Sequence, residues 1–194
     1  RLLGDTRNYA VINEDPTSRL LMNVKSMVEE ATNNCWVSPR EAEFLVNISP
    51  KIPYFYILPK IHKNRTPPPG RPIVSGLGSL LEPLSQFCDH FLKPLVQKTP
   101  TYLRDTKDVL VLIQGLSFDP TEEFLVGLDI ESLYTSLPHE DTLAVLEEVL
   151  FSEVWDFDTP RQFILDCARL VLTENFFAFE DTLYIQRHGT SMGS

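Results

Sequence analysis

The sequence predicts an α+β fold in which antiparallel strands are flanked by helices. Stretches with apolar residues at helical spacing alternate with runs of aromatic and β-branched residues that are typical of strands. The strand-like runs come in pairs separated by turn residues, which indicates hairpins. The chain lacks the repeated strand–helix–strand rhythm that builds a parallel sheet.

The first fifty residues predict two helices. Apolar residues recur at helical spacing through residues 17–32, after a Thr-Ser pair that can cap the helix. A second, short helix is expected to begin after Ser38, because Ser can cap free amides, Pro39 is tolerated in the first turn and Glu41 closes a capping box. Residues 1–50 are assigned to a helical lead-in region.

A basic β-hairpin is expected next. Residues 53–59 (PYFYILP) form an aromatic, proline-bounded run, and residues 71–75 (RPIVS) return as a second short strand. Three consecutive prolines and a glycine between them exclude regular structure there. The hairpin is therefore expected to have a long, mobile tip, which carries Lys63 and Arg65.

The remaining chain predicts four helices, a buried strand and a second hairpin. Residues 124–130 (FLVGLDI) are nearly continuously apolar and end in a charge, the pattern of a central strand that delivers an acid at its end. The runs FFAF and TLYIQ flank Glu180 and Asp181 and predict the hairpin. The helices are expected at about residues 79–96, from Asp105 to about Gly115, and at about 139–151 and 160–173.

Composition excludes several classes of protein. The 194 residues are 43% hydrophobic, enough to bury a core, yet no run approaches the ~20 apolar residues of a membrane span or resembles a secretory signal. Three widely separated cysteines indicate neither a disulfide framework nor a zinc site. We expect an intracellular protein with no membrane partner and, because it begins at Arg and ends in SMGS, a fragment.

Charge is unevenly distributed along the chain. The formal net charge of −10 argues at first against nucleic-acid binding. Residues 44–81, however, contain no acid, and every charged residue in 108–160 is Asp or Glu. A basic segment followed by an acidic one is what a site for both a polyphosphate and divalent metals would need. Charge alone, however, favours the simpler interpretation of a solvated acidic face beside a basic loop. The basic segment carries Lys51, Lys60, Lys63, Arg65 and Arg71.

Three blocks of sequence resemble the reverse transcriptases. LDIESLYTSLPHE, which contains Asp129, resembles polymerase motif A, most closely that of Penelope-like retroelements. FYILPKIHK followed by GRPIVSG resembles the fingers hairpin of the same elements, and QRHGTSMGS resembles the start of motif B. The resemblance covers roughly residues 50–194. It implies a right-hand polymerase fold, with fingers at 51–118 and, at 119–194, a partial palm that holds motif A and the start of motif B.

The resemblance also implies an activity and its principal residues. It implies an RNA-directed DNA polymerase of a retroelement, acting in the nucleus on an RNA template, a DNA primer and a dNTP by two-metal nucleotidyl transfer with Mg²⁺. Asp129 would be the catalytic metal ligand, joined by the backbone carbonyl of Ile130. Lys60 and Arg71 would flank the triphosphate. Tyr134 would be the steric gate against a 2′-hydroxyl, unless it is a core tyrosine.

Further residues have less specific expected roles. Lys63 and Arg65 are either template-phosphate contacts or surface cations. Gly189, Met192 and Gly193 would form the turn and helix start that pack against the templating base pair, with Met192 at the nucleotide.

Three polar residues near these motifs are not assigned to the catalytic or nucleotide site. Glu131 is read as a solvated or structural acid, and His62 as a residue that shapes its loop. Gln186 stands three residues before the motif B glycine and does not inherit the role of the glutamine found in many relatives.

The remaining metal ligands of the family come from motif C, a pair of aspartates after an aromatic residue. No two aspartates are adjacent in the 194 residues, and Glu180 with Asp181 precedes motif B, which is the wrong order. We therefore expect no polymerase activity from this chain alone. A second hypothesis is a non-catalytic nucleic-acid-binding or interaction module derived from a decayed or domesticated retroelement. A phosphatase of the Asp-x-Asp-Thr type is disfavoured, because the second Asp and the Thr are missing.

Overall fold

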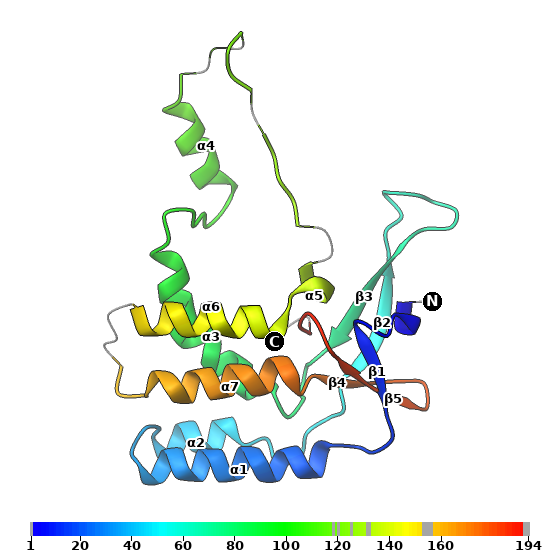
Figure 1. The fold of residues 1–194 in the computed structure, drawn as a ribbon, viewed down its shortest axis with the longest axis vertical. Coiled ribbons are helices and arrows are strands. Elements are labelled where there is room, and N and C mark those ends of the chain that lie inside the picture. Colours follow the sequence, from blue (N-terminus) through cyan, green and yellow to red (C-terminus); the bar gives the residue numbers. More distant parts are fainter. Residues whose placement is uncertain are drawn as a thin grey trace.

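The fold was analysed in a computed structural model that describes residues 2–117, 119, 121–124, 126–130, 133–152 and 157–191. Over these residues it is a mixed α+β arrangement of seven α-helices and one five-stranded sheet. Figure 1 shows most helices stacked beside the sheet, while one helix and its flanking segments project away from this body.

The sheet is mixed and has the order β1-β5-β4-β2-β3. Its neighbours are antiparallel except β2 and β4, which are parallel and meet where the Ala178 amide donates to the Pro53 carbonyl at 2.7 Å. The expectation of purely antiparallel strands was therefore wrong at this one junction. The hairpins β2–β3 and β4–β5 confirm the two expected from the sequence, whereas β1 was not expected. The strands are β1 Tyr9–Ile12, β2 Tyr54–Pro59, β3 Gly70–Ser75, β4 Phe176–Phe179 and β5 Thr182–Gln186.

An aromatic cluster holds the sheet together. Tyr9 of β1 packs edge-on against Phe177 of β4, with ring centroids 5.6 Å apart, and Phe55 of β2 stacks on the same ring at 5.6 Å. Val74 of β3 completes the buried cluster. Strands from opposite ends of the chain thus share one apolar core.

Five helices form the second and larger core. It is built from buried side chains such as Val24, Leu45, Phe87, Leu150 and Ile164, one from each helix. Within the described residues, no helix combines the length and the apolar character needed to cross a bilayer. The five are α1 Thr17–Asn33, α2 Pro39–Leu45, α3 Glu82–Gln97, α6 His139–Ser152 and α7 Arg161–Thr173; a short 3₁₀ turn, Leu2–Gly4, precedes β1.

The helix starts follow local capping chemistry. At α2 the capping box is confirmed, because the Glu41 amide donates to Ser38 Oγ at 3.3 Å and the Ser38 amide donates to Glu41 Oε2 at 2.6 Å. At α1 the expected Thr-Ser cap was wrong. The N-cap is Pro16, which makes no side-chain cap bond, and the carboxylate of Asp15, before the helix, accepts from the Thr17 amide at 2.9 Å.

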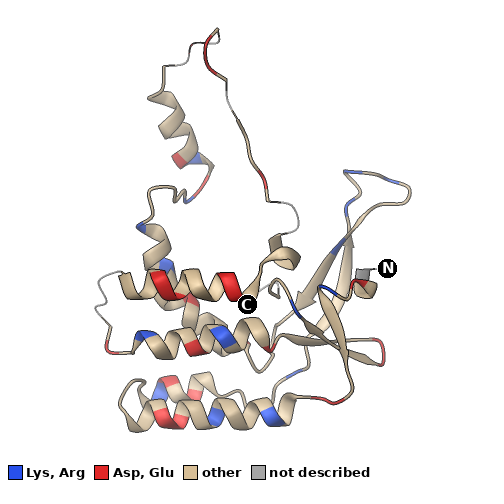
Figure 2. Ribbon diagram, viewed as in Figure 1, with Lys and Arg blue, Asp and Glu red and all other residues tan. Residues whose placement is uncertain are grey.

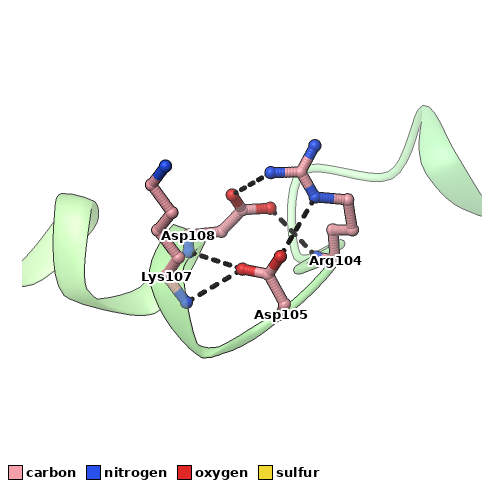
Figure 3. Close-up of polar contacts among 4 residues, drawn as sticks. All are labelled: Arg104, Asp105, Lys107 and Asp108. Atoms are coloured by element: carbon pink, nitrogen blue, oxygen red, sulfur yellow. Dashed lines mark hydrogen bonds and ion pairs between the residues drawn. The ribbon is translucent and has the colours of Figure 1, made fainter.

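Helix α4 (Thr106–Gln114) begins at the predicted cap. Asp105 Oδ1 accepts from the amides of Lys107 at 2.8 Å and Asp108 at 3.1 Å (Figure 3). Arg104 bridges the carboxylates of Asp105 and Asp108 at 3.3 and 3.1 Å. These contacts are local to one helix start, so they define the helix without fixing it to the rest of the molecule.

The predicted central strand at 124–130 is not present. Its described residues have no strand structure and are exposed, Phe124 at 82% and Leu128 at 94%. A strand needs a neighbour for its amides and carbonyls, and no described strand lies beside this run. It belongs to what we call the arm, residues 98–130, whose described residues are all exposed except Asp108 and Val109, which are half-buried.

Candidate functional site

A pocket of ≈500 Å³ lies between the base of the β2–β3 tip and the end of the arm. From the hairpin side it is lined by residues that follow β2 or open β3. From the other side it is lined by the last residues of the arm and by α5, a single turn at Leu133–Ser136. The lining consists of Lys60, His62, Lys63, Arg71, Pro72, Asp129, Ile130, Leu133, Tyr134 and Thr135.

The pocket brings together five residues that the sequence analysis singled out for the nucleotide or metal. Lys60 and Arg71 come from the hairpin, and Asp129, Ile130 and Tyr134 come from a segment more than fifty residues later in the chain. All but Lys60, which is half-buried, are exposed, so each can reach a ligand that enters from solvent.

The hairpin register fixes the basic side of the pocket. Arg71 pairs with Leu58, one step from the end of the ladder where Pro59 faces Gly70. The Lys60 amide then donates to the Pro69 carbonyl at 2.7 Å, which extends the pairing beyond the strands. The Lys63 amide donates back to the Lys60 carbonyl at 3.1 Å and closes a turn. The backbone thus holds three cations around one opening.

The opposite side of the pocket depends on α5. This turn has no buried side chain, but its Tyr134 carbonyl accepts from Gln186 Nε2 at 3.1 Å and from the Thr190 amide at 3.0 Å. The Gly189 amide donates to the Leu137 carbonyl at 2.7 Å. The turn after β5 therefore holds α5 in place, and with it the Tyr134 ring beside the pocket.

The other predicted site residues lie elsewhere. Arg65 is at the far end of the tip, in a shallow hollow that it shares with Asn64 and Lys63. Gly189 is buried behind α5 and does not line the pocket. Met192 and Gly193, the remaining motif B residues, and Glu131 lie outside the described residues.

The two sides of the pocket differ in charge. Figure 2 shows basic residues along the connection between β2 and β3, and acidic residues along the part of the arm that descends to α5. Lys60, Lys63 and Arg71 face the pocket from one side and the Asp129 carboxylate from the other. A ligand with both anionic groups and a bound cation suits this arrangement.

Asp129 alone makes an incomplete metal site. In the part of the chain that the structure describes, no three His, Cys, Asp or Glu side chains gather to hold an ion. Mg²⁺ commonly uses only one or two protein carboxylates and takes its other oxygens from substrate phosphates and water. The Asp129 carboxylate and the Ile130 carbonyl therefore fit a Mg²⁺ ion that arrives with a polyphosphate.

No protein-family model, curated protein or solved structure matches the chain.

Sequence reasoning missed the residues that hold α5. Gln186 is 2% exposed, and its partner Asn175 is 5% exposed. His139, at the start of α6, donates from Nε2 to the Gly189 carbonyl at 2.7 Å. Gln186 and His139 bond backbone carbonyls as many as 52 positions away, and Asn175 bonds the side chain of Gln186. The only signal in the sequence was the exclusion of Gln186 from the usual glutamine role.

Proposed function

We propose that the chain is the fingers and part of the palm of a retroelement reverse transcriptase, and that its pocket binds a deoxynucleoside triphosphate with Mg²⁺. One observation carries the proposal. The residues that the resemblance assigns to triphosphate, metal and sugar are drawn from two separate sequence blocks, and they line the same pocket. Composition alone gives no reason for these particular side chains to meet.

Each residue would act through its own chemistry. Arg71 has a planar fork that can grip two phosphate oxygens, and Lys60 supplies a compact positive charge to the same group. The Tyr134 ring lies on the α5 side, where it would leave no room for a 2′-hydroxyl. Arg71 and Lys60 would thus bind the triphosphate, and Tyr134 would discriminate between deoxyribose and ribose.

Asp129 and the Ile130 carbonyl would hold Mg²⁺ against the triphosphate. When bound, the ion neutralises phosphate charge and stabilises the charge that develops during nucleotidyl transfer. Because the chain has no adjacent pair of aspartates, it supplies only one of the carboxylates that the resemblance implies. We propose nucleotide binding, and not polymerisation, as the property that this chain shows by itself.

The test is nucleotide binding to the 194-residue chain. Calorimetric titration with dATP and Mg²⁺ is expected to show one site, and the double variant Lys60→Ala/Arg71→Ala to weaken it by at least about tenfold, because two phosphate contacts are lost. The matched control is Lys25→Ala/Lys93→Ala, which removes the same charge from exposed positions on α1 and α3. Equal weakening in both double variants would leave only non-specific attraction and refute the site.

Asp129→Asn gives a second readout in the same titration. The substitution is expected to abolish the gain in dATP affinity that Mg²⁺ provides, while affinity without Mg²⁺ stays the same or rises as a negative charge is removed. An unchanged Mg²⁺ dependence would remove Asp129 from the metal role. Asp129 is exposed, so the variant is expected to fold normally.

The second candidate function is a non-catalytic nucleic-acid-binding module. It is favoured by the acid-free segment 44–81, whose Lys63 and Arg65 lie at the tip of the hairpin. A module of this kind would bind single-stranded RNA through phosphate contacts, more weakly as salt rises, and would bind dATP with no Mg²⁺ dependence. If the variant with Lys60, Lys63, Arg65 and Arg71 all changed to Ala retains RNA unchanged, this candidate fails.

A further inference from the structure

We propose that Gln186 is a positioning residue that sets the sugar selectivity of the pocket through its hydrogen bond to the backbone carbonyl of Tyr134. The inference rests on the proposed nucleotide site and adds to it the origin of its selectivity. Gln186 does not line the pocket, and it would act only through the turn that carries the Tyr134 ring.

The side chain of Gln186 is buried, and both of its N–H groups and its oxygen form hydrogen bonds. Its Nε2 donates to the Tyr134 carbonyl at 3.1 Å and to the His188 carbonyl at 2.7 Å. Its Oε1 accepts from Asn175 Nδ2 at 2.9 Å. One amide therefore links the β4–β5 hairpin, through Gln186 and the residue before β4, to α5, which lies 52 positions earlier in the chain.

The partners of the Gln186 amide fix which way it faces. The Tyr134 and His188 carbonyls can only accept, so both N–H groups of Gln186 must face them, and its oxygen then accepts from Asn175 Nδ2. The Gln186 backbone amide also donates to the Asn175 carbonyl at 2.8 Å. The pair is thus doubly bonded, and the donor direction toward Tyr134 is set before any ligand binds.

Gly189 packs tightly against the hydrogen bond between Gln186 and the Tyr134 carbonyl. A Cβ added at Gly189 would lie 2.1 Å from the Tyr134 carbonyl oxygen and 2.7 Å from Gln186 Nε2, so only glycine fits behind this bond. Gly189 also has φ of +81°, a conformation that glycine adopts without strain. The bend after β5 thus brings the chain against α5 and leaves the carbonyl little space to move.

The position of helix α5 depends on hydrogen bonds and not on buried side chains. It is a single turn with no buried side chain, and Tyr134 itself is 47% exposed. The hydrogen bonds to its backbone therefore decide where the ring stands relative to Asp129 and Lys60. Loss of the Gln186 donor is expected to let the ring move, which would remove the steric test of the 2′-position while leaving the phosphate contacts on the hairpin intact.

The test compares dATP and ATP binding, both with Mg²⁺, in the 194-residue chain. The wild type is expected to prefer dATP by about tenfold or more, and Gln186→Met, of similar length but without donors, to bring the ratio close to one. Affinity for dATP is expected to change much less than the ratio. Val24→Ala, which opens a cavity in the helical core, controls for destabilisation alone and should keep the preference.

A double variant separates positioning from general structure. In a Tyr134→Ala background the gate is absent, so Gln186→Met should change the ratio no further if Gln186 acts through Tyr134. Asn175→Ala, which leaves Gln186 present but removes the donor to its oxygen, should shift the ratio in the same direction, and it tests the inference if Gln186→Met does not fold.

The outcomes distinguish the two proposals. A wild-type chain that binds dATP and ATP equally, or neither, refutes the proposed gate and the inference with it. A wild-type preference for dATP that persists in both folded Gln186→Met and Asn175→Ala overturns the inference and leaves the proposed function standing. Equal loss of preference in Val24→Ala would also overturn it, since the effect would then follow stability and not position.

Discussion

The hydroxyl of Tyr9 is buried in the aromatic cluster of the sheet. Tyr9 is 4% exposed, and its hydroxyl has no hydrogen-bond partner among the described residues. Burial raises the pKa of this phenol, and the nearby Asp5 carboxylate raises it further. The ring packs well, but on folding its hydroxyl loses its hydrogen bonds to water and gains none in the protein, which lowers the stability of the folded state.

Tyr9→Phe is therefore expected to stabilise the protein. Removing an unsatisfied buried hydroxyl while keeping the ring should raise the free energy of unfolding by about 1 kcal/mol. Urea denaturation measures this as a higher midpoint at an unchanged slope. Tyr184→Phe is the control, because Tyr184 stacks on the same Phe177 ring but is only half-buried, and its effect should be near zero. A lower midpoint for Tyr9→Phe would mean that the hydroxyl has a partner.

Glycine positions offer a second test at the same scale. Gly189→Ala meets both a positive φ, worth about 1–2 kcal/mol, and backbone overlap at the Tyr134 carbonyl, so a loss of more than about 2 kcal/mol is expected. Gly127→Ala meets no atom within 4 Å and should change stability by less than about 0.5 kcal/mol. Thermal unfolding ranks the two, and a similar shift for both would contradict the close packing behind α5.

The site was only partly predictable from individual residues. Lys60, Arg71, Asp129 and Tyr134 stand in recognisable motifs, so sequence order was sufficient to select them. The role of Gln186 depends on the carbonyl of a residue 52 positions away. A backbone carbonyl leaves no signature in the sequence, so no pattern could have named this contact.

Among the elements, α2 shows how a charge can contribute to a helix start. The hydrogen bonds from Ser38, side chain and backbone, hold the pKa of the Glu41 carboxyl below its usual value. A pKa that is lower in the folded state means that the ionised form stabilises folding. This contribution is present above the unfolded pKa, about 4.5, and is lost as pH falls through the lower folded value.

Glu41→Gln is expected to reveal that dependence. At pH 7 the variant should be less stable than wild type by about 0.3–1 kcal/mol, a small value because the carboxylate is partly exposed. The difference should be smaller at pH 3, because the contribution is lost as pH falls through the lowered folded pKa of Glu41. Glu43→Gln in the same helix is exposed and should show no such trend. Urea unfolding at the two pH values makes the comparison.

Elements were predictable where their signals are local. Each of these signals involves residues that are close together in the sequence. They are the caps at Ser38 and Asp105, the apolar periodicity of α1, α3, α6 and α7, and the turn residues of both hairpins. The run 124–130 has strand composition, yet a strand also requires a neighbour, and that requirement is not local. Strand β1 was not predicted, because the four residues YAVI are too few to indicate a strand. They form one only because β5 lies beside them.

At the scale of the whole molecule, the arm differs from the body. It carries exposed apolar side chains, including Leu110 at 55%, Leu112 at 60% and Leu128 at 94%, and α4 has no buried residue. Segments with so few buried contacts open at little free-energy cost. None of the three hydrophobic core clusters includes a described residue of the arm.

Limited chymotrypsin digestion is therefore expected to cut the arm first, at sites such as Leu103, Leu110 or Phe124. The fragments on either side should stay associated through the helical core, which joins α1–α3 to α6 and α7, with little loss of the helical circular-dichroism signal. Initial cleavage inside α1 or α7, where every apolar side chain except that of Met22 is buried or half-buried, would contradict this division. Intact mass after short digestion times identifies the first cut.

The pairing of β1 with β5 has a consequence for how the protein forms in the cell. Tyr9 stands opposite Gln186, so the edge of the sheet joins almost the first and almost the last described residues. During synthesis at about 5–20 residues per second, β1 leaves the ribosome roughly 10–35 s before its partner exists. Through that interval the amides and carbonyls of β1 have only water or a chaperone to bind, and this edge of the sheet can close only after β5 has been synthesised.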